Sequence, residues 1–142
     1  MKLSDLIADH PQVIESVSAD LRDREATELA SSMTWHDENS WTAYVATSHG
    51  VYVGVSDFHP NTNRARFESD LTPWADVSGV TRVYAGYSGE YSTLMVSMAV
   101  PDVTLSSHRP ESAPWRALEE FADTCAKYGR GWQKAVDGSE AH

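Results

Sequence analysis

The first group of residues that could take part in chemistry lies in the segment 35–40, where His36, Asp37 and Glu38 follow one another beside Trp35. Imidazole and carboxylate groups are metal ligands, and loops often carry functional residues. Neighbouring residues of an extended connector point in different directions, however, and no further pair of ligands follows at a fixed spacing. We therefore interpret this segment as a solvated linker and expect neither a metal site nor a cofactor.

The remaining candidates for catalysis are scattered along the chain. His49, His59 and His108 each fall in a predicted turn or loop, without a His-x-His or His-Glu-x-x-His pattern. No serine lies in a Gly-x-Ser-x-Gly motif. Cys125 lies on the apolar face of a predicted helix, where an inert buried thiol is the usual outcome. The sequence therefore predicts a protein that is not an enzyme.

Large side chains outside the regular elements are the better candidates for binding. Trp41 and Trp115 fall in predicted elements and are expected in the core, whereas Trp35 and Trp132 fall outside them. Exposed aromatic side chains are frequent anchors of protein interfaces. Together with the acids beside Trp35 and a predicted loop over residues 57–63, they give a set of predicted partner-binding residues: Trp35, Asp37, Glu38, Phe58, His59 and Trp132.

Composition describes one acidic globular domain. The chain has 142 residues, 41% of them hydrophobic and 23% charged, which is enough for one core. Its formal net charge is −10, and residues 31–60 contain no Lys or Arg. Such a surface repels phosphate groups, so we expect neither nucleic-acid nor lipid binding. Arg64 and Arg66 share one strand face and are expected to pair with Glu68 or Asp70.

The location of the protein is predicted from what the chain lacks. A single cysteine, Cys125, excludes an intramolecular disulfide and a cysteine-based zinc cluster. The first residues carry no long apolar run typical of a signal peptide, and no stretch approaches the ~20 apolar residues of a membrane span. A cytoplasmic protein without a membrane span is the expectation.

Hydrophobic periodicity predicts a helix, about seven strands and a second helix. Helical spacing of apolar residues indicates an amphipathic helix over residues 4–33, with a possible break at Arg24 and Glu25. The C-terminal helix is expected to begin near Trp115. Between the helices, alternation and turn residues predict strands over residues 41–47, 51–55, 64–67, 71–77, 80–87, 91–100 and 103–107. Pro73 marks the fourth of these as an edge or irregular strand.

The order of these elements and two local stretches resemble bacterial pleckstrin-homology-like (PH-like and GRAM-like) domains. Residues 44–52 (YVATSHGVY) are similar to the opening hairpin of that family, and residues 73–80 (PWADVSGV) to its turn into a middle strand. The resemblance implies an α+β fold, in which an antiparallel β-barrel or sandwich of about seven strands is followed by a C-terminal helix. The N-terminal helix is an addition to the family pattern.

The resemblance covers residues 41–128 and divides the chain into three parts. These are an N-terminal amphipathic helix and connector over 1–40, a PH-like domain over 41–128 and a tail over 129–142. The lipid-binding members of the family carry basic residues on the first hairpin, whereas residues 47–57 here contain none. What the resemblance implies is a scaffold that binds proteins, since fold alone does not fix function.

Two functions follow as hypotheses. The first is a non-catalytic PH-like protein-interaction module with a protein partner. The alternative is an acidic inhibitor protein of the phage type, which mimics nucleic acid and occupies a basic groove of an enzyme; it is favoured by the net charge of −10. A homodimer is a further expectation if residues 91–100 lie at an exposed sheet edge.

Overall fold

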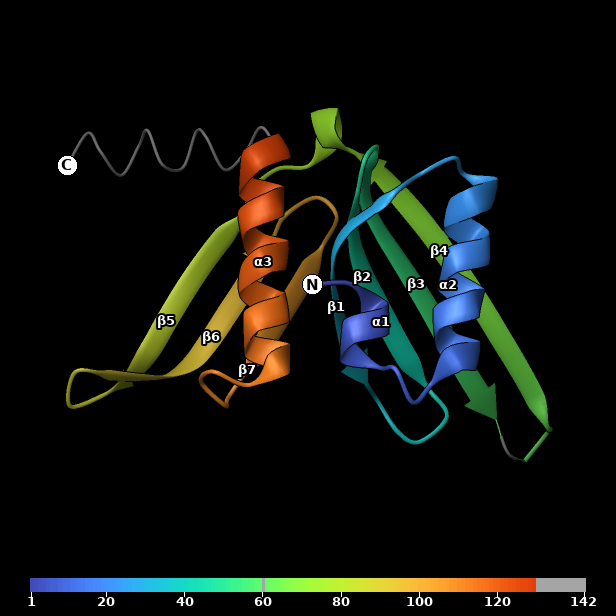
Figure 1. The fold of residues 1–142 in the computed structure, drawn as a ribbon, viewed down its shortest axis with the longest axis horizontal. Helices are drawn as coiled ribbons and strands as arrows, with labels where there is room; N and C mark the ends of the chain where they lie inside the picture. Colours follow the sequence, from blue (N-terminus) through green and yellow to red (C-terminus); the bar gives the residue numbers. More distant parts are fainter. Residues whose placement is uncertain (60, 130–142) are drawn as a thin grey trace.

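The computed structural model describes residues 1–59 and 61–129, which form two antiparallel sheets and three α-helices (Figure 1). In chain order the elements are α1 (Leu3–Leu6), α2 (Pro11–Asp23), β1 (Glu28–Trp35), β2 (Trp41–Thr47), β3 (Gly50–His59), β4 (Arg64–Pro73), the 3-10 turn η1 (Trp74–Asp76), β5 (Thr81–Tyr87), β6 (Glu90–Met98), β7 (Val103–Ser107) and α3 (Ala113–Tyr128).

The N-terminal helix predicted over residues 4–33 is wrong in its second half. The helix α2 ends at Asp23, and Glu25 then takes a left-handed backbone angle (φ 56°) that turns the chain. The following residues form β1, which pairs with β2 along its length. Leu29 and Met33 belong to residue types that favour helices, but pairing with a neighbouring strand overrides so weak a preference.

The four-stranded sheet has the order β1-β2-β3-β4, and every neighbouring pair is antiparallel. The hairpin predicted around residues 48–50 is confirmed as the β2–β3 turn. The predicted strands over 64–67 and 71–77 are one strand, β4, which ends at Pro73. It lies at the edge of its sheet, as the missing N–H of Pro73 predicts.

The three-stranded sheet has the order β5-β6-β7. Because β6 is its central strand, residues 91–100 offer no edge at which a second copy could pair, and this route to a homodimer is wrong. The turn between β6 and β7 is linked to the segment before β5: the Ser78 N–H donates to the Val100 carbonyl (3.0 Å), and the Ala99 N–H donates to the Ser78 carbonyl (2.9 Å).

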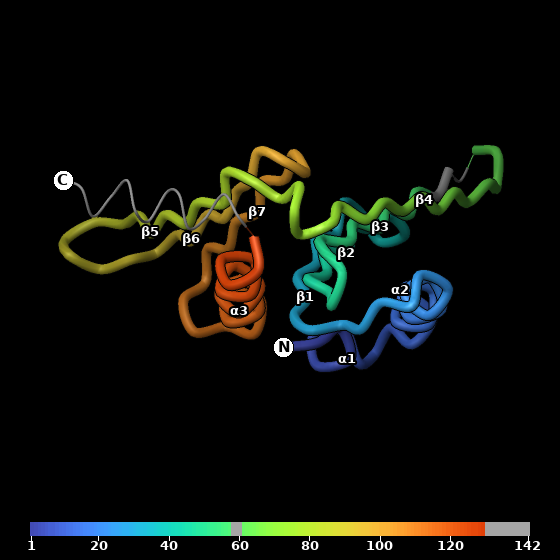
Figure 2. Tube along the Cα trace, turned by 90° about the horizontal axis from the view of Figure 1, so that it is seen from above, coloured from blue at the N-terminus to red at the C-terminus, as the bar shows by residue number. Residues whose placement is uncertain are grey.

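The helices all lie on one side of the two sheets. Figure 2 shows α1 and α2 below the four-stranded sheet and α3 below the junction of the two sheets, with the β6–β7 turn on the opposite side. The helix α3 packs against β1 of one sheet and β7 of the other. Its N-terminus is capped by Ser112, whose hydroxyl accepts from the Trp115 N–H (3.3 Å).

Two apolar cores follow from this arrangement. The first lies beneath α3 between the sheets and includes Val51, Val80, Leu94, Phe121 and Cys125. The second lies between the four-stranded sheet and the N-terminal helices, and its buried members are Leu3, Ile7, Val17, Leu21, Trp41, Ala43, Val45 and Tyr52. Trp41 and Trp115 are 5% and 6% exposed, so their prediction as core residues is confirmed.

A polar cluster joins α2 to the four-stranded sheet. The buried Tyr52 hydroxyl donates to Asp20 Oδ2 (2.6 Å), and Arg24 lies 3.5 Å from Asp20 Oδ1. The Arg24 guanidinium also donates to the Ser69 hydroxyl (3.0 Å) and carbonyl (3.3 Å) on β4. Burial and the neighbouring Asp20 carboxylate raise the pKa of Tyr52, so its phenol stays protonated.

These features confirm the predicted α+β class, with antiparallel sheets and a C-terminal helix. The two sheets stay open and do not close on each other, so the barrel implied by the PH-like resemblance is not confirmed. Among the helices of the described residues, none is long and apolar enough to cross a membrane.

Candidate functional site

Five of the six residues predicted to bind a partner lie at one end of the four-stranded sheet. Because the sheet is antiparallel, the β1–β2 and β3–β4 connections meet at this end (Figure 1). Trp35 is the last residue of β1, is 37% exposed and makes a tilted ring contact with His10, with ring centroids 4.8 Å apart. Asp37 and Glu38 are exposed in the following turn.

The other predicted binding residues are placed by the backbone alone or not at all. Phe58 and His59 belong to the last residues of β3, not to a loop as predicted, because β3 is longer than its apolar alternation indicates. Their pairing with Ala65 and Arg64 places them near the β3–β4 connection. Trp132 lies outside the described residues.

The scattered candidates for catalysis have different neighbours. His49 Nε2 lies 2.9 Å from the Glu25 carbonyl, whereas His108 Nδ1 lies 3.4 Å from the Thr93 hydroxyl. Burial raises the pKa of the Cys125 thiol to about 12, which keeps it protonated and unreactive. Arg66 pairs with Glu68, as predicted. Within residues 1–59 and 61–129, no three His, Cys, Asp or Glu side chains meet as a metal site.

A groove that was not predicted lies on the face of the four-stranded sheet opposite α1 and α2. It has a volume of about 650 Å³. Alternation along β2 sends Trp41, Ala43 and Val45 to the helices and Thr42 and Tyr44 to the groove. The lining residues are Thr42, Tyr44, Val53, Val55, Glu68, Ser69, Asp70, Thr72, Pro101, Asp102 and Val103.

Three strands and one turn build this groove. The pairing of Tyr44 with Val53 and of Val53 with Asp70 lines up β2, β3 and β4 across its floor. The β6–β7 turn, which carries Pro101 and Asp102, forms a wall of the groove beside this floor. The Ser78–Val100 backbone pairing holds that turn in place above the sheet.

The floor of the groove is partly apolar and carries one phenol. Val53, Val55 and Tyr44 are half-buried there. Burial raises the pKa of Tyr44, while side-chain hydrogen bonds with Thr42 and Thr34 oppose that rise. His36 Nε2 lies 2.7 Å from the Thr42 hydroxyl and extends this polar row toward the β1–β2 turn. Tyr44 therefore offers a neutral hydroxyl and an aromatic ring.

The rim of the groove is acidic on both sides. Glu68 and Asp70 lie on β4, and Asp102 faces them from the β6–β7 turn. No Lys, Arg or His is among the described residues that line it. All three carboxylates are exposed at the rim and can reach a group that enters the groove. This arrangement is suited to binding.

Sequence reasoning missed the groove because its residues are distant in the chain. The alternation of Thr42 and Tyr44 with Trp41 and Ala43 was visible, but it does not say which face a helix will cover. Pro101 and Asp102 fall between the predicted strands over 91–100 and 103–107, and neither was among the predicted site residues. Comparisons of the chain with protein-family models, with curated proteins and with solved structures give no match.

Proposed function

We propose that this protein is a non-catalytic, PH-like protein-interaction module that binds a protein partner in the groove of its four-stranded sheet. The observation that carries this proposal is the uncovered groove of about 650 Å³ on a sheet whose opposite face is filled by α1 and α2. Concave sites with an apolar floor and a few polar groups are the usual places for ligands. The groove also borders the end of the sheet that carries Trp35, Asp37 and Glu38.

Site-specific photocrosslinking in cells tests this function. A photoreactive phenylalanine analogue replaces Thr72, an uncharged lining residue of the groove, or Tyr87, which is 88% exposed at the tip of the β5–β6 hairpin. We expect a discrete covalent adduct with a protein from the Thr72 position and not from Tyr87. A second substitution, Val55→Trp, fills the groove and should remove that adduct while leaving the melting temperature nearly unchanged.

Two results would contradict the proposal. One is the same set of adducts from both positions, which indicates chance encounters at the surface. The other is a groove adduct that persists when Val55→Trp fills the site, since the partner would then be held elsewhere.

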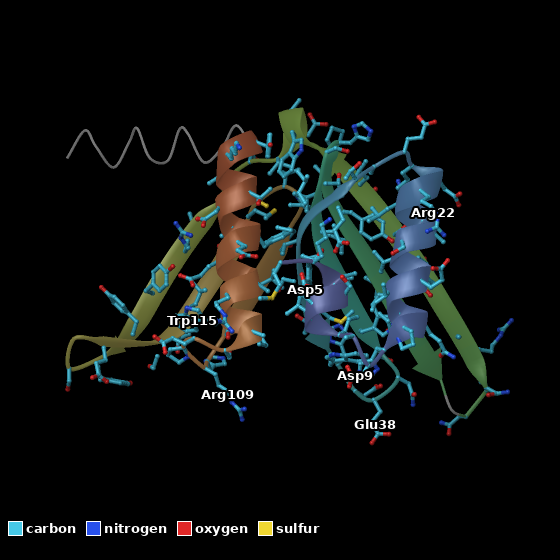
Figure 3. All side chains as sticks on the ribbon, viewed as in Figure 1. Asp5, Asp9, Arg22, Glu38, Arg109 and Trp115 are labelled. Carbon is cyan, nitrogen blue, oxygen red and sulfur yellow. The ribbon has the colours of Figure 1, made fainter. Side chains whose placement is uncertain are left out.

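A second candidate function is the acidic inhibitor that occupies a basic groove of an enzyme. It is supported by exposed acids on the half of the molecule formed by α1, α2 and the four-stranded sheet, among them Asp5, Asp9 and Glu38 (Figure 3). Such an inhibitor would compete with duplex DNA for its target, and high salt would abolish the competition. Its binding would not depend on Val55.

A further inference from the structure

We infer that the groove receives a lysine or arginine side chain presented by the partner protein. This inference rests on the proposed function, because it names what the partner places in the groove. Three features of the site support it. These are the negative charge of its rim, the apolar surface of its floor and the bound or missing backbone groups at the neighbouring edge of β4.

The charge of the groove selects a cation. Glu68, Asp70 and Asp102 approach from two sides, with no basic side chain among the described lining residues. The pair between Arg66 and Glu68 offsets part of this charge, but both side chains are largely exposed and such surface pairs contribute little. Asp70 accepts from the Leu71 N–H (3.0 Å) through Oδ1, and that bond does not use Oδ2. An anionic group entering here would be repelled.

The floor of the groove suits a cation on an aliphatic stem. Lysine and arginine bury their methylene groups against apolar surface while the charged end reaches polar groups. Val53, Val55 and Val103 supply apolar surface of this kind, and the Tyr44 ring adds an aromatic face. A small metal ion would leave these apolar contacts unused.

At the edge of β4 beside the groove, several of the outward backbone groups that an added strand would use are bound or absent. The Trp74 N–H donates to the His49 carbonyl (3.3 Å), so the adjacent pair Gly50–Pro73 is of the non-hydrogen-bonded type. Alternation then turns the backbone groups of Pro73, Leu71 and Ser69 out of the sheet.

Each of these outward positions lacks at least one backbone group that a new strand would pair with. Proline has no N–H to donate, the Leu71 N–H is bound to Asp70, and the Ser69 carbonyl accepts from Arg24. A partner therefore reaches the groove from the open face with a side chain, and not by extending the sheet at this point.

The direct test is an NMR titration of the full chain with three capped tripeptides. Acetyl-Gly-Arg-Gly-amide and its lysine analogue carry the charge, and the citrulline analogue keeps the shape of arginine without it. We expect saturable amide shifts around Tyr44, Val53 and Val55 with the two cationic peptides, and at least tenfold weaker binding of the citrulline peptide. Equal binding of citrulline, or no saturable shift with any peptide, would overturn the inference.

Charge variants distinguish binding of the cationic peptide in the groove from its general electrostatic attraction to an acidic protein. The double variant Asp70→Asn with Asp102→Asn removes two charges from the rim, and the asparagine oxygen can still accept from the Leu71 N–H. The matched control Asp5→Asn with Asp9→Asn removes two exposed charges from the α1 side (Figure 3). We expect a tenfold or greater loss of arginine-peptide affinity in the first and less than twofold in the second. Equal losses would refute a groove-specific site.

The inference and the proposed function can fail separately. Suppose that Val55→Trp removes the partner adduct but the double rim variant crosslinks as well as the wild type. The proposed binding in the groove is then supported, and the inference of a lysine or arginine side chain is refuted. If Val55→Trp leaves the adduct intact, the proposed function itself fails.

Discussion

At the scale of single residues, the Asp20–Tyr52 contact shows how one carboxylate joins a helix to a sheet. Burial alone would raise the pKa of Asp20, but hydrogen bonds from Ser69 and Tyr52 and the charge of Arg24 outweigh it and lower the pKa. The carboxylate is therefore stabilised by folding. Because the partners come from β3, β4 and the end of α2, they fix the position of α2 on the sheet.

We predict that Asp20→Asn lowers the free energy of unfolding by about 1–3 kcal/mol at pH 7, since it weakens a charged hydrogen bond. A group whose pKa falls on folding stabilises the protein above its unfolded pKa, about 4, and loses this effect as the pH falls through the folded pKa. The difference between wild type and variant should therefore shrink below about pH 4. Urea unfolding between neutral and acid pH measures it.

The control for this prediction is Asp23→Asn, an exposed acid at the end of the same helix. It should change stability by less than about 0.5 kcal/mol. A double-mutant cycle with Tyr52→Phe should be non-additive, because both changes remove the same hydrogen bond. Full additivity would show that Asp20 acts through other contacts.

At the scale of elements, the β2–β3 turn depends on the absence of a side chain at Gly50. A Cβ built there would lie 1.9 Å from the Thr72 carbonyl oxygen of β4. The turn can therefore pass directly beside the edge strand only with glycine. The same close approach aligns β3 with β4 next to the groove, where Val51 pairs with Thr72.

We predict that Gly50→Ala destabilises the protein by at least about 2 kcal/mol, because backbone must move to admit the methyl group. Gly89→Ala is the matched control: Gly89 has a φ of 80° but no atom within 4 Å of a Cβ. Its cost should be about 1 kcal/mol, from the left-handed backbone angle alone. Thermal unfolding of both variants compares them, and equal costs would argue against a steric role for the Thr72 carbonyl.

The elements also show where sequence reasoning succeeds. Residues 41–47 and 103–107 alternate clearly, and the strands there were predicted with their observed bounds. The strand β1 was missed because Glu28, Leu29 and Met33 favour helix, while its actual stabilisation comes from pairing with β2. The length of β3 was underestimated because Ser56 and Asp57 end its apolar run, although their pairing with Phe67 and Arg66 continues the ladder.

At the scale of the whole molecule, the groove combines β2, β3 and β4 with the β6–β7 turn, from which β5 and β6 separate them in the chain. Sequence patterns describe one element at a time, so Tyr44 and Asp102 could not be assigned to one site. Trp35, Asp37 and Glu38 are neighbours in the sequence, so they could be predicted as one group of binding residues without knowledge of the tertiary fold. Their role in binding stays a prediction.

The position of α3 predicts one cooperative unfolding transition. The helix packs on the three-stranded sheet and on β1, and the core beneath it includes Ala46 and Val51 of the four-stranded sheet, so both sheets lose apolar contacts without it. We expect the calorimetric and van't Hoff enthalpies of unfolding to agree. Phe121→Ala, in the centre of α3, should lower the melting temperature of the single transition without splitting it. Two separate transitions would show that the sheets unfold independently.

The edge of β4 has a consequence for behaviour at high concentration. Exposed sheet edges are the places where folded proteins polymerise into ordered aggregates. Along the half nearest Pro73 the Leu71 N–H and the Ser69 carbonyl are bound within the molecule and Pro73 has no N–H, and along the other half Arg64, Arg66 and Glu68 are exposed. Charged side chains on an edge strand hinder its pairing with a second copy. Self-assembly along this strand is thus hindered by bound backbone groups in one half and by charged side chains in the other.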